Sequence, residues 1–138
     1  MTDFVLDNSV TMRWCFDAGT HEYADNILRT LMAAESSAFV PILWRYEVSA
    51  VLARAQLRGT VPPEEVAFFL EDLANLDITV DTASGEHVLT DVHRLAITYR
   101  LTSYDAAYLE LTLRKKLPLA TLDDDLRKAC LNAGGAVI

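Results

Sequence analysis

DFVLD, residues 3–7, begins the chain with a short apolar run between two carboxylates. The three apolar residues at 4–6 are typical of a fully buried strand, which shows no alternation of polar and apolar side chains. Asp7 follows at the point where the strand turns into the next segment. Strands of similar character are predicted at 38–40, 77–81 and 118–122, with a last one at 136–138.

The segments between these strands have the apolar spacing of helices. We expect helices at 9–16, 20–32, 42–58, 62–76, 84–99, 104–116 and 124–134. Ser9 and Ser103 are the expected caps of two of them, because a serine hydroxyl accepts from free amides of the first turn. Short strands that alternate with helices predict an α/β protein with a parallel sheet.

Composition narrows the possible classes of protein. The chain has 138 residues, of which 51% are apolar, and its 12 basic and 20 acidic side chains leave a net charge of −8. Half-apolar composition excludes an intrinsically disordered chain, and the length suits a single domain over residues 1–138. The apolar run at 38–44 is too short to span a bilayer, and the first residues do not resemble a signal peptide.

The two cysteines, Cys15 and Cys130, lack the spacing of a zinc or redox motif. We therefore expect a cytoplasmic protein with reduced thiols and no membrane contact. Its acidic balance disfavours sequence-independent binding of DNA through a basic face. The function of so many carboxylates is the question that composition raises.

Four acidic positions differ from the solvated ones in their surroundings. Asp7 ends an apolar strand, where it is either a helix cap or a site residue. Glu47 lies at the margin of a buried helical stripe, where a carboxylate needs an ion pair or a cation. Asp105 is in the first turn of a largely apolar helix, where the helix dipole offers an alternative reason for it. Asp123 directly follows a buried strand and begins a run of three aspartates.

These carboxylates would repel one another if the fold brought them together. Clustered carboxylate oxygens are the ligands that Mg²⁺ and Mn²⁺ prefer. A metal of this kind activates water and stabilises charge on a phosphoryl oxygen, so the pattern points to phosphodiester hydrolysis. Which of Asp123, Asp124 and Asp125 reaches the metal stays open at this stage.

Four motifs that contain these acids resemble a known family. FVLDNSV at 4–10, RYEV at 45–48, SYDAAYLELT at 103–112 and LATLDDDL at 119–126 are similar, in content and in order, to the PIN-domain ribonucleases. Among these, the VapC-type toxins of bacterial toxin–antitoxin pairs are the most similar. The resemblance covers the whole chain, and it implies a three-layer α/β/α sandwich around a central parallel sheet.

The resemblance also implies the members of the site. It places one or two Mg²⁺ or Mn²⁺ ions among four catalytic, metal-binding carboxylates, those of Asp7, Glu47, Asp105 and Asp123. Ser9 and Thr121 match small hydroxyl positions that hold the acidic groups by hydrogen bonds. The T-x-D pattern at 121–123 selects Asp123 from its run, with Asp125 in a supporting place.

The implied function is metal-dependent cleavage of RNA, often transfer or ribosomal RNA, which stops translation. The implied partners are an antitoxin protein, whose C-terminal segment fills the active-site groove, and a second copy of the chain in a homodimer. Arg13 and Arg45 are our candidates for contacts with RNA phosphates. Arg114 is a further candidate, with solvation at the end of its helix as the favoured alternative. The aromatic residues near the acidic motifs either stack on bases or pack in the core. These are Trp14, Trp44, Tyr46 and Tyr104.

Two alternatives remain from other classes of protein. A phospho-acceptor signalling domain needs a pair of acids after the first strand and a late lysine, and Leu117-Pro118 stands where that lysine would be. A catalytically silent module of the same fold, which only binds RNA or protein, is the stronger alternative. We expect the three histidines to be structural in either case. They are His21, His87 and His93.

Overall fold

A computed structural model describes residues 3–138 of the chain. Its four strands form one sheet in the order β3-β2-β1-β4, and all neighbouring pairs are parallel. The strands are β1 (Phe4–Leu6), β2 (Ala38–Val40), β3 (Ile78–Val80) and β4 (Leu119–Ala120). The parallel α/β prediction is therefore confirmed. The strand expected at 136–138 is reduced to one parallel bridge between Val137 and Leu119.

The helices follow the strands closely, as the apolar spacing predicts. They are α1 (Asn8–Phe16), α2 (Glu22–Met32), α3 (Ile42–Leu57), α4 (Pro63–Ala74), α5 (His93–Tyr99), α6 (Ser103–Lys115) and α7 (Asp124–Asn132). The single helix expected at 84–99 is instead three consecutive pieces. A 3₁₀ turn η1 (Ser84–His87) and a π-helical turn η2 (Val88–Val92) precede α5.

Both predicted serine caps are wrong by one or two residues. Asp7 occupies the cap position of α1, and its side chain makes no capping hydrogen bond. Thr102 caps α6, where its hydroxyl accepts from the Asp105 amide at 3.1 Å. Serine and threonine are both good caps, so local sequence could not decide between neighbouring hydroxyls.

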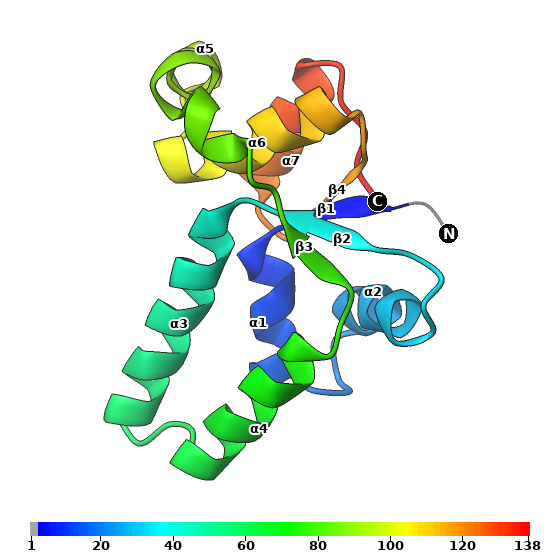
Figure 1. Cartoon of the computed structure of the whole chain (residues 1–138), viewed down its shortest axis with the longest axis vertical. Helices are drawn as coiled ribbons and strands as arrows, with labels where there is room; N and C mark the ends of the chain where they lie inside the picture. The colour runs from blue at the N-terminus through cyan, green and yellow to red at the C-terminus, as the bar shows by residue number, and fades with distance from the viewer. Residues whose placement is uncertain (1–2) are drawn as a thin grey trace.

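The elements form three layers, which Figure 1 shows in one view. Helices α1 to α4 lie on one side of the sheet, and α5 to α7 lie on the other. Helices α3 and α4 form a hairpin that extends away from the sheet. The strands β1 and β4 are fully buried, and Leu109 and Leu111 of α6 are buried with them. Within the described residues, no helix has the length and hydropathy needed to cross a membrane.

An ion-pair network attaches α6 to the edge strand β3. Asp81 directly follows β3, and its Oδ2 lies 2.6 Å from Nη2 of Arg114, near the end of α6. The same guanidinium binds Glu110 through Nε at 2.9 Å. Burial alone would raise the pKa of Asp81, but hydrogen bonds from Arg114 and Ser84 bring that pKa below its ordinary value. Arg114 is thereby committed to the fold, and the expectation that it is solvated at the helix end is wrong, because its guanidinium binds two largely buried carboxylates.

Replacing Arg114 tests this attachment. Arg114→Met keeps the apolar stem but leaves Asp81 and Glu110 without their shared cation, and their side chains are only 9% and 5% exposed. We expect the free energy of unfolding to fall by about 2 kcal/mol, because breaking a largely buried pair strands its acidic partner. Urea unfolding followed by circular dichroism measures this change.

Lys115→Met is the matched control. Its amine approaches Asp81 only to 3.9 Å, and it lies over the Phe39 ring, so a loss below about 1 kcal/mol is expected. Equal losses in the two variants would contradict a specific role for Arg114.

Candidate active site

The four predicted carboxylates come from four different segments and lie near one another beyond the carboxyl ends of the strands. Asp7 directly follows β1, and Asp123 comes soon after β4. Glu47 lies on α3, which begins just after β2, and Asp105 is in the first turn of α6. Parallel sheets place their functional side chains at this edge, because all their strands end there.

Asp7 is the most enclosed member of the group. It is 5% exposed, and its Oδ2 accepts hydrogen bonds from the hydroxyls of Ser9 at 2.6 Å and Thr121 at 2.7 Å. The Ser9 oxygen accepts in turn from the Leu122 amide at 2.9 Å. Burial raises the pKa of Asp7, and the charge of Asp123 adds to this rise, while the two hydroxyls oppose it. Asp7 is thus at the cap position of α1, but two hydroxyls, and not the amides of the helix, hold its carboxylate.

Glu47 is held by a residue that sequence reasoning missed. The hydroxyl of Tyr108 donates to its Oε1 at 2.5 Å, and the Tyr108 side chain is fully buried. Burial raises the pKa of Glu47, the charges of Asp7 and Asp105 raise it further, and the tyrosine hydrogen bond lowers it. Among the described residues, no arginine or lysine pairs with Glu47, so the ion-pair alternative is wrong.

A signal for Tyr108 was present in the sequence. Tyr108 follows Asp105 by three residues on α6, so the two side chains share one face of the helix. That face is turned toward Glu47 of α3, which lies 61 residues earlier in the chain. The helical spacing alone could not show that a glutamate from another element completes the contact.

Asp105 carries the largest electrostatic strain of the four acids. Burial raises its pKa to about 6, and the charges of Asp123, Asp7 and Asp125 contribute. Asp123 uses its Oδ1 to cap α7, where it accepts from the Leu126 amide at 2.9 Å. Its second oxygen is left for the site. Asp125 is exposed in the first turn of α7 and acts on Asp105 only through its charge.

Among the described residues, no basic side chain forms an ion pair with any of the four carboxylates. In the same part of the chain, no three acidic, histidine or cysteine side chains already stand close enough to form a metal-binding group. The donor chemistry fits a hard divalent cation, which would relieve the mutual repulsion. Binding one would require these carboxylates to come closer together than they stand here.

The basic candidates differ in their freedom to bind RNA. Arg13 pairs with Asp17 at 2.7 Å and lies over the Phe16 ring, so it is engaged within α1 and its C-terminal cap. Arg45 is exposed and makes no ion pair with a described residue. Arg45 is therefore available for contacts, but it lines a groove with residues of α4 and β3 and lies two residues from Glu47, on another face of α3.

The aromatic candidates divide in the same way. Trp14 and Trp44 are buried, and their indole N–H groups donate to the Ala24 carbonyl at 2.8 Å and the Thr11 hydroxyl at 3.0 Å. Both tryptophans are therefore core residues. Tyr46 and Tyr104 are 72% and 64% exposed, and each is next to a site carboxylate in sequence.

The histidines take no part in the carboxylate site. His21 caps α2 by accepting from the Ala24 amide at 3.3 Å, and His87 contacts Asp91 at 2.9 Å. His93 is exposed at the start of α5. Their structural interpretation agrees with this placement.

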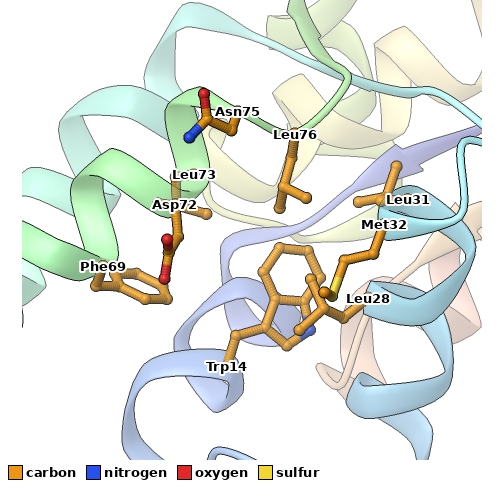
Figure 2. Close-up of a pocket in the computed structure, with 9 residues that line it drawn as sticks. All are labelled: Trp14, Leu28, Leu31, Met32, Phe69, Asp72, Leu73, Asn75 and Leu76. Carbon is orange, nitrogen blue, oxygen red and sulfur yellow. The ribbon is translucent and has the colours of Figure 1, made fainter.

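An apolar pocket of about 410 Å³ lies apart from the carboxylates. Figure 2 shows its wall, in which Trp14 of α1 faces Leu28 and Met32 of α2, with Phe69 and Leu73 of α4 opposite. None of the four site acids lines it. Its lining is mainly apolar and contains a single carboxylate, that of Asp72, so the chemistry is assigned to the open edge where four carboxylates gather.

The fold and this edge define an α/β protein with a group of acidic side chains beyond the carboxyl ends of its parallel strands, and comparison with known proteins identifies the family. The family model described as PIN domain matches residues 4–131, so the chain belongs to the PIN domain family. Ribonuclease VapC3 from Pyrobaculum aerophilum is 35% identical over 81 residues, which cover 59% of this chain and 62% of that protein.

Solved structures share the fold at lower identity. PAE2754 from Pyrobaculum aerophilum has a TM-score of 0.68 at 21% identity, over 93% of this chain and 79% of that one. VapBC2 from Rickettsia felis, bound to a DNA fragment from their promoter, has a TM-score of 0.67 at 10% identity. That match covers 94% of this chain and 93% of the other. At these identities the structures support the three-layer fold alone.

The raised pKa of Asp105 predicts how stability depends on pH. Because its pKa is about 6 in the folded protein and ordinarily 3.8, folding favours the protonated form. Stability should therefore fall as pH rises from about 4 to 6 and stay reduced above that range. In EDTA at pH 7.5, Asp105→Asn should raise the melting temperature by about 3 °C, and at pH 4 the gain should vanish. Asp124→Asn, an exposed neighbour of the site, is the control and should show no such pH dependence.

Removing the tyrosine hydroxyl tests the second support. The hydrogen bond from Tyr108 favours the ionised form of Glu47. Tyr108→Phe should therefore raise the pKa of Glu47, which a carbon-13 NMR titration of the glutamate carboxyl signals in EDTA would measure. An unchanged titration of Glu47 would show that the hydroxyl does not stabilise its charge.

Proposed function

We propose that this PIN-domain protein is a metal-dependent endoribonuclease that acts as the toxin of a toxin–antitoxin pair. The observation that carries the proposal is the group of four carboxylates without basic partners, three of which have raised pKa values. Repulsion within such a group lowers the stability of the folded protein, and the group becomes useful only when a cation and a substrate bind there. The similar protein named a ribonuclease supports RNA as the substrate.

Asp7, Glu47, Asp105 and Asp123 would hold the Mg²⁺ or Mn²⁺. When bound, the cation supplies Lewis acidity to a phosphoryl oxygen and a water of lowered pKa. Asp7 offers an oxygen fixed by two hydroxyls, and Tyr108 restricts the rotation of Glu47. These two carboxylates therefore set the geometry of the site, while Asp105 and the second oxygen of Asp123 close it. A phosphodiester oriented in this way is open to in-line attack by water.

The open edge suits a polymer better than a small molecule. The exposed Tyr46 and Tyr104 flank the acids on α3 and α6, where they offer stacking faces to bases. Arg45 offers a charge to the backbone. Single-stranded or looped segments of transfer or ribosomal RNA expose bases for such contacts, and their cleavage would inhibit translation.

The proposed partner is a cytoplasmic antitoxin protein that fills the active-site groove. A basic side chain placed among Asp7, Glu47 and Asp105 would neutralise the same repulsion that a metal relieves. Inhibition by such a segment and activation by metal would then be mutually exclusive. A homodimer of the toxin chain completes the proposed assembly.

Cleavage of RNA tests the function directly. We expect total bacterial RNA to yield discrete fragments with Mg²⁺ or Mn²⁺ and none with EDTA. Asp7→Asn and Asp105→Asn should each lower the cleavage rate at least about 100-fold, because each removes a charged oxygen that holds the metal, yet both should stay folded. Gel analysis of the fragments measures the rates.

Asp124→Asn controls for the loss of one negative charge next to the site and should cleave at the wild-type rate. Full activity in both Asp7→Asn and Asp105→Asn would refute the assigned site. Tight RNA binding without cleavage by the metal-loaded wild type would instead favour the catalytically silent module.

A further inference from the structure

A second pocket, of about 300 Å³, lies between the turn that joins α5 to α6 and the outer face of α7. Tyr99, Arg100 and Leu101 form one wall. Asp125 and Lys128 lie on the other, together with Ala129 and Asn132. We call it the Arg100–Lys128 pocket. None of the roles assigned above uses Arg100, Lys128 or Tyr99.

The pocket borders the carboxylate site. Asp125 lines it, and this residue follows the site residue Asp123 by two positions at the start of α7. On the opposite wall, Arg100 and Leu101 directly precede Thr102, which caps α6 by accepting a hydrogen bond from the Asp105 amide. An RNA strand that occupied the carboxylate site would therefore pass next to the pocket, on the side of α7.

The two cations of the pocket are exposed and uncommitted. Arg13, Arg94, Arg114 and Lys115 each approach a carboxylate, whereas Arg100 and Lys128 form no ion pair among residues 3–138. Even with Asp125 counted, the lining carries a net charge of +1 in a chain whose net charge is −8. Unpaired cations next to an acidic site supply the local attraction for polyanions that the whole molecule lacks.

We propose that the Arg100–Lys128 pocket binds a phosphodiester of the RNA strand that flanks the cleaved one. This inference rests on the proposed function for its ligand. Phosphate contacts by arginine and lysine position a nucleic acid without reading its sequence. The half-buried ring of Tyr99 adds a flat apolar surface against which a ribose or base packs.

The test measures binding without cleavage, in EDTA. Fluorescence anisotropy of a labelled, unstructured single-stranded RNA gives Kd over a series of salt concentrations. For the double variant Arg100→Gly/Lys128→Gln, we expect Kd to rise about tenfold at 0.1 M salt, as two phosphate contacts are lost. The slope of log Kd against log salt should fall by about 1.4, that is, about 0.7 for each contact on a single strand.

The chain contains a matched control for Arg100. Lys116 is also an exposed cation that ends a helix in the left-handed conformation, with φ 56° at both positions. It lies at the other end of α6, whose 13 residues span about 20 Å. Glycine is favourable at both positions, so each change removes one charge without backbone strain. Lys116→Gly should leave Kd and the salt slope unchanged, and Arg100→Lys should retain the wild-type slope.

The outcomes separate this inference from the proposed function. An unchanged salt slope in the double variant, an equal loss in Lys116→Gly, or a wild type that binds no RNA would overturn the pocket. Metal-dependent cleavage with an unchanged slope would leave the nuclease intact and refute the pocket alone. A reduced slope in a protein that never cleaves RNA would support the pocket and refute the nuclease.

Discussion

The hydrogen bonds from Ser9 and Thr121 to the buried carboxylate of Asp7 are the interaction on which the rest of the structure depends. The bond from Thr121 links the end of β4 to the end of β1, 114 residues away along the chain, at the carboxyl ends of the strands. The same Thr121 oxygen accepts from the Asp123 amide at 3.0 Å, so one hydroxyl places two acids. A charge held by short, rigid partners keeps its position even though burial opposes its ionisation.

Helix α6 carries both the destabilising acid and the groups that stabilise the site along its length. Its first turn carries Asp105, its middle supplies the Tyr108 hydroxyl to Glu47, and its end carries Arg114 between Asp81 and Glu110. The strained acid and the stabilising ion pairs are therefore on one rigid element. The ion pairs in the C-terminal half of α6 stabilise the position of its N-terminal half, where like charges repel one another.

The surface complements this arrangement by separating its charges. The site acids gather at one edge, and Arg100 and Lys128 stand next to them without ion pairs, while Arg13, Arg94 and Arg114 pair with carboxylates. An acidic protein can attract a polyanion only through such local imbalance, because long-range attraction is screened beyond about 10 Å at ordinary salt. The apolar pocket between α1, α2 and α4 has a different character, because its lining is mainly apolar and carries little charge.

The sequence by itself determined the four strands, their parallel pairing and the order of the four acids, because apolar runs and helical spacing are local properties. It could not decide that the Asp7 carboxylate accepts from two hydroxyls and not from the amides of α1, that Thr102 and not Ser103 caps the start of α6, or that Tyr108 contacts Glu47. It also could not show that Arg13 is engaged while Arg100 is free. Only the tertiary structure decided these, since each depends on which distant segments the fold brings within hydrogen-bond reach, and no local pattern encodes that distance.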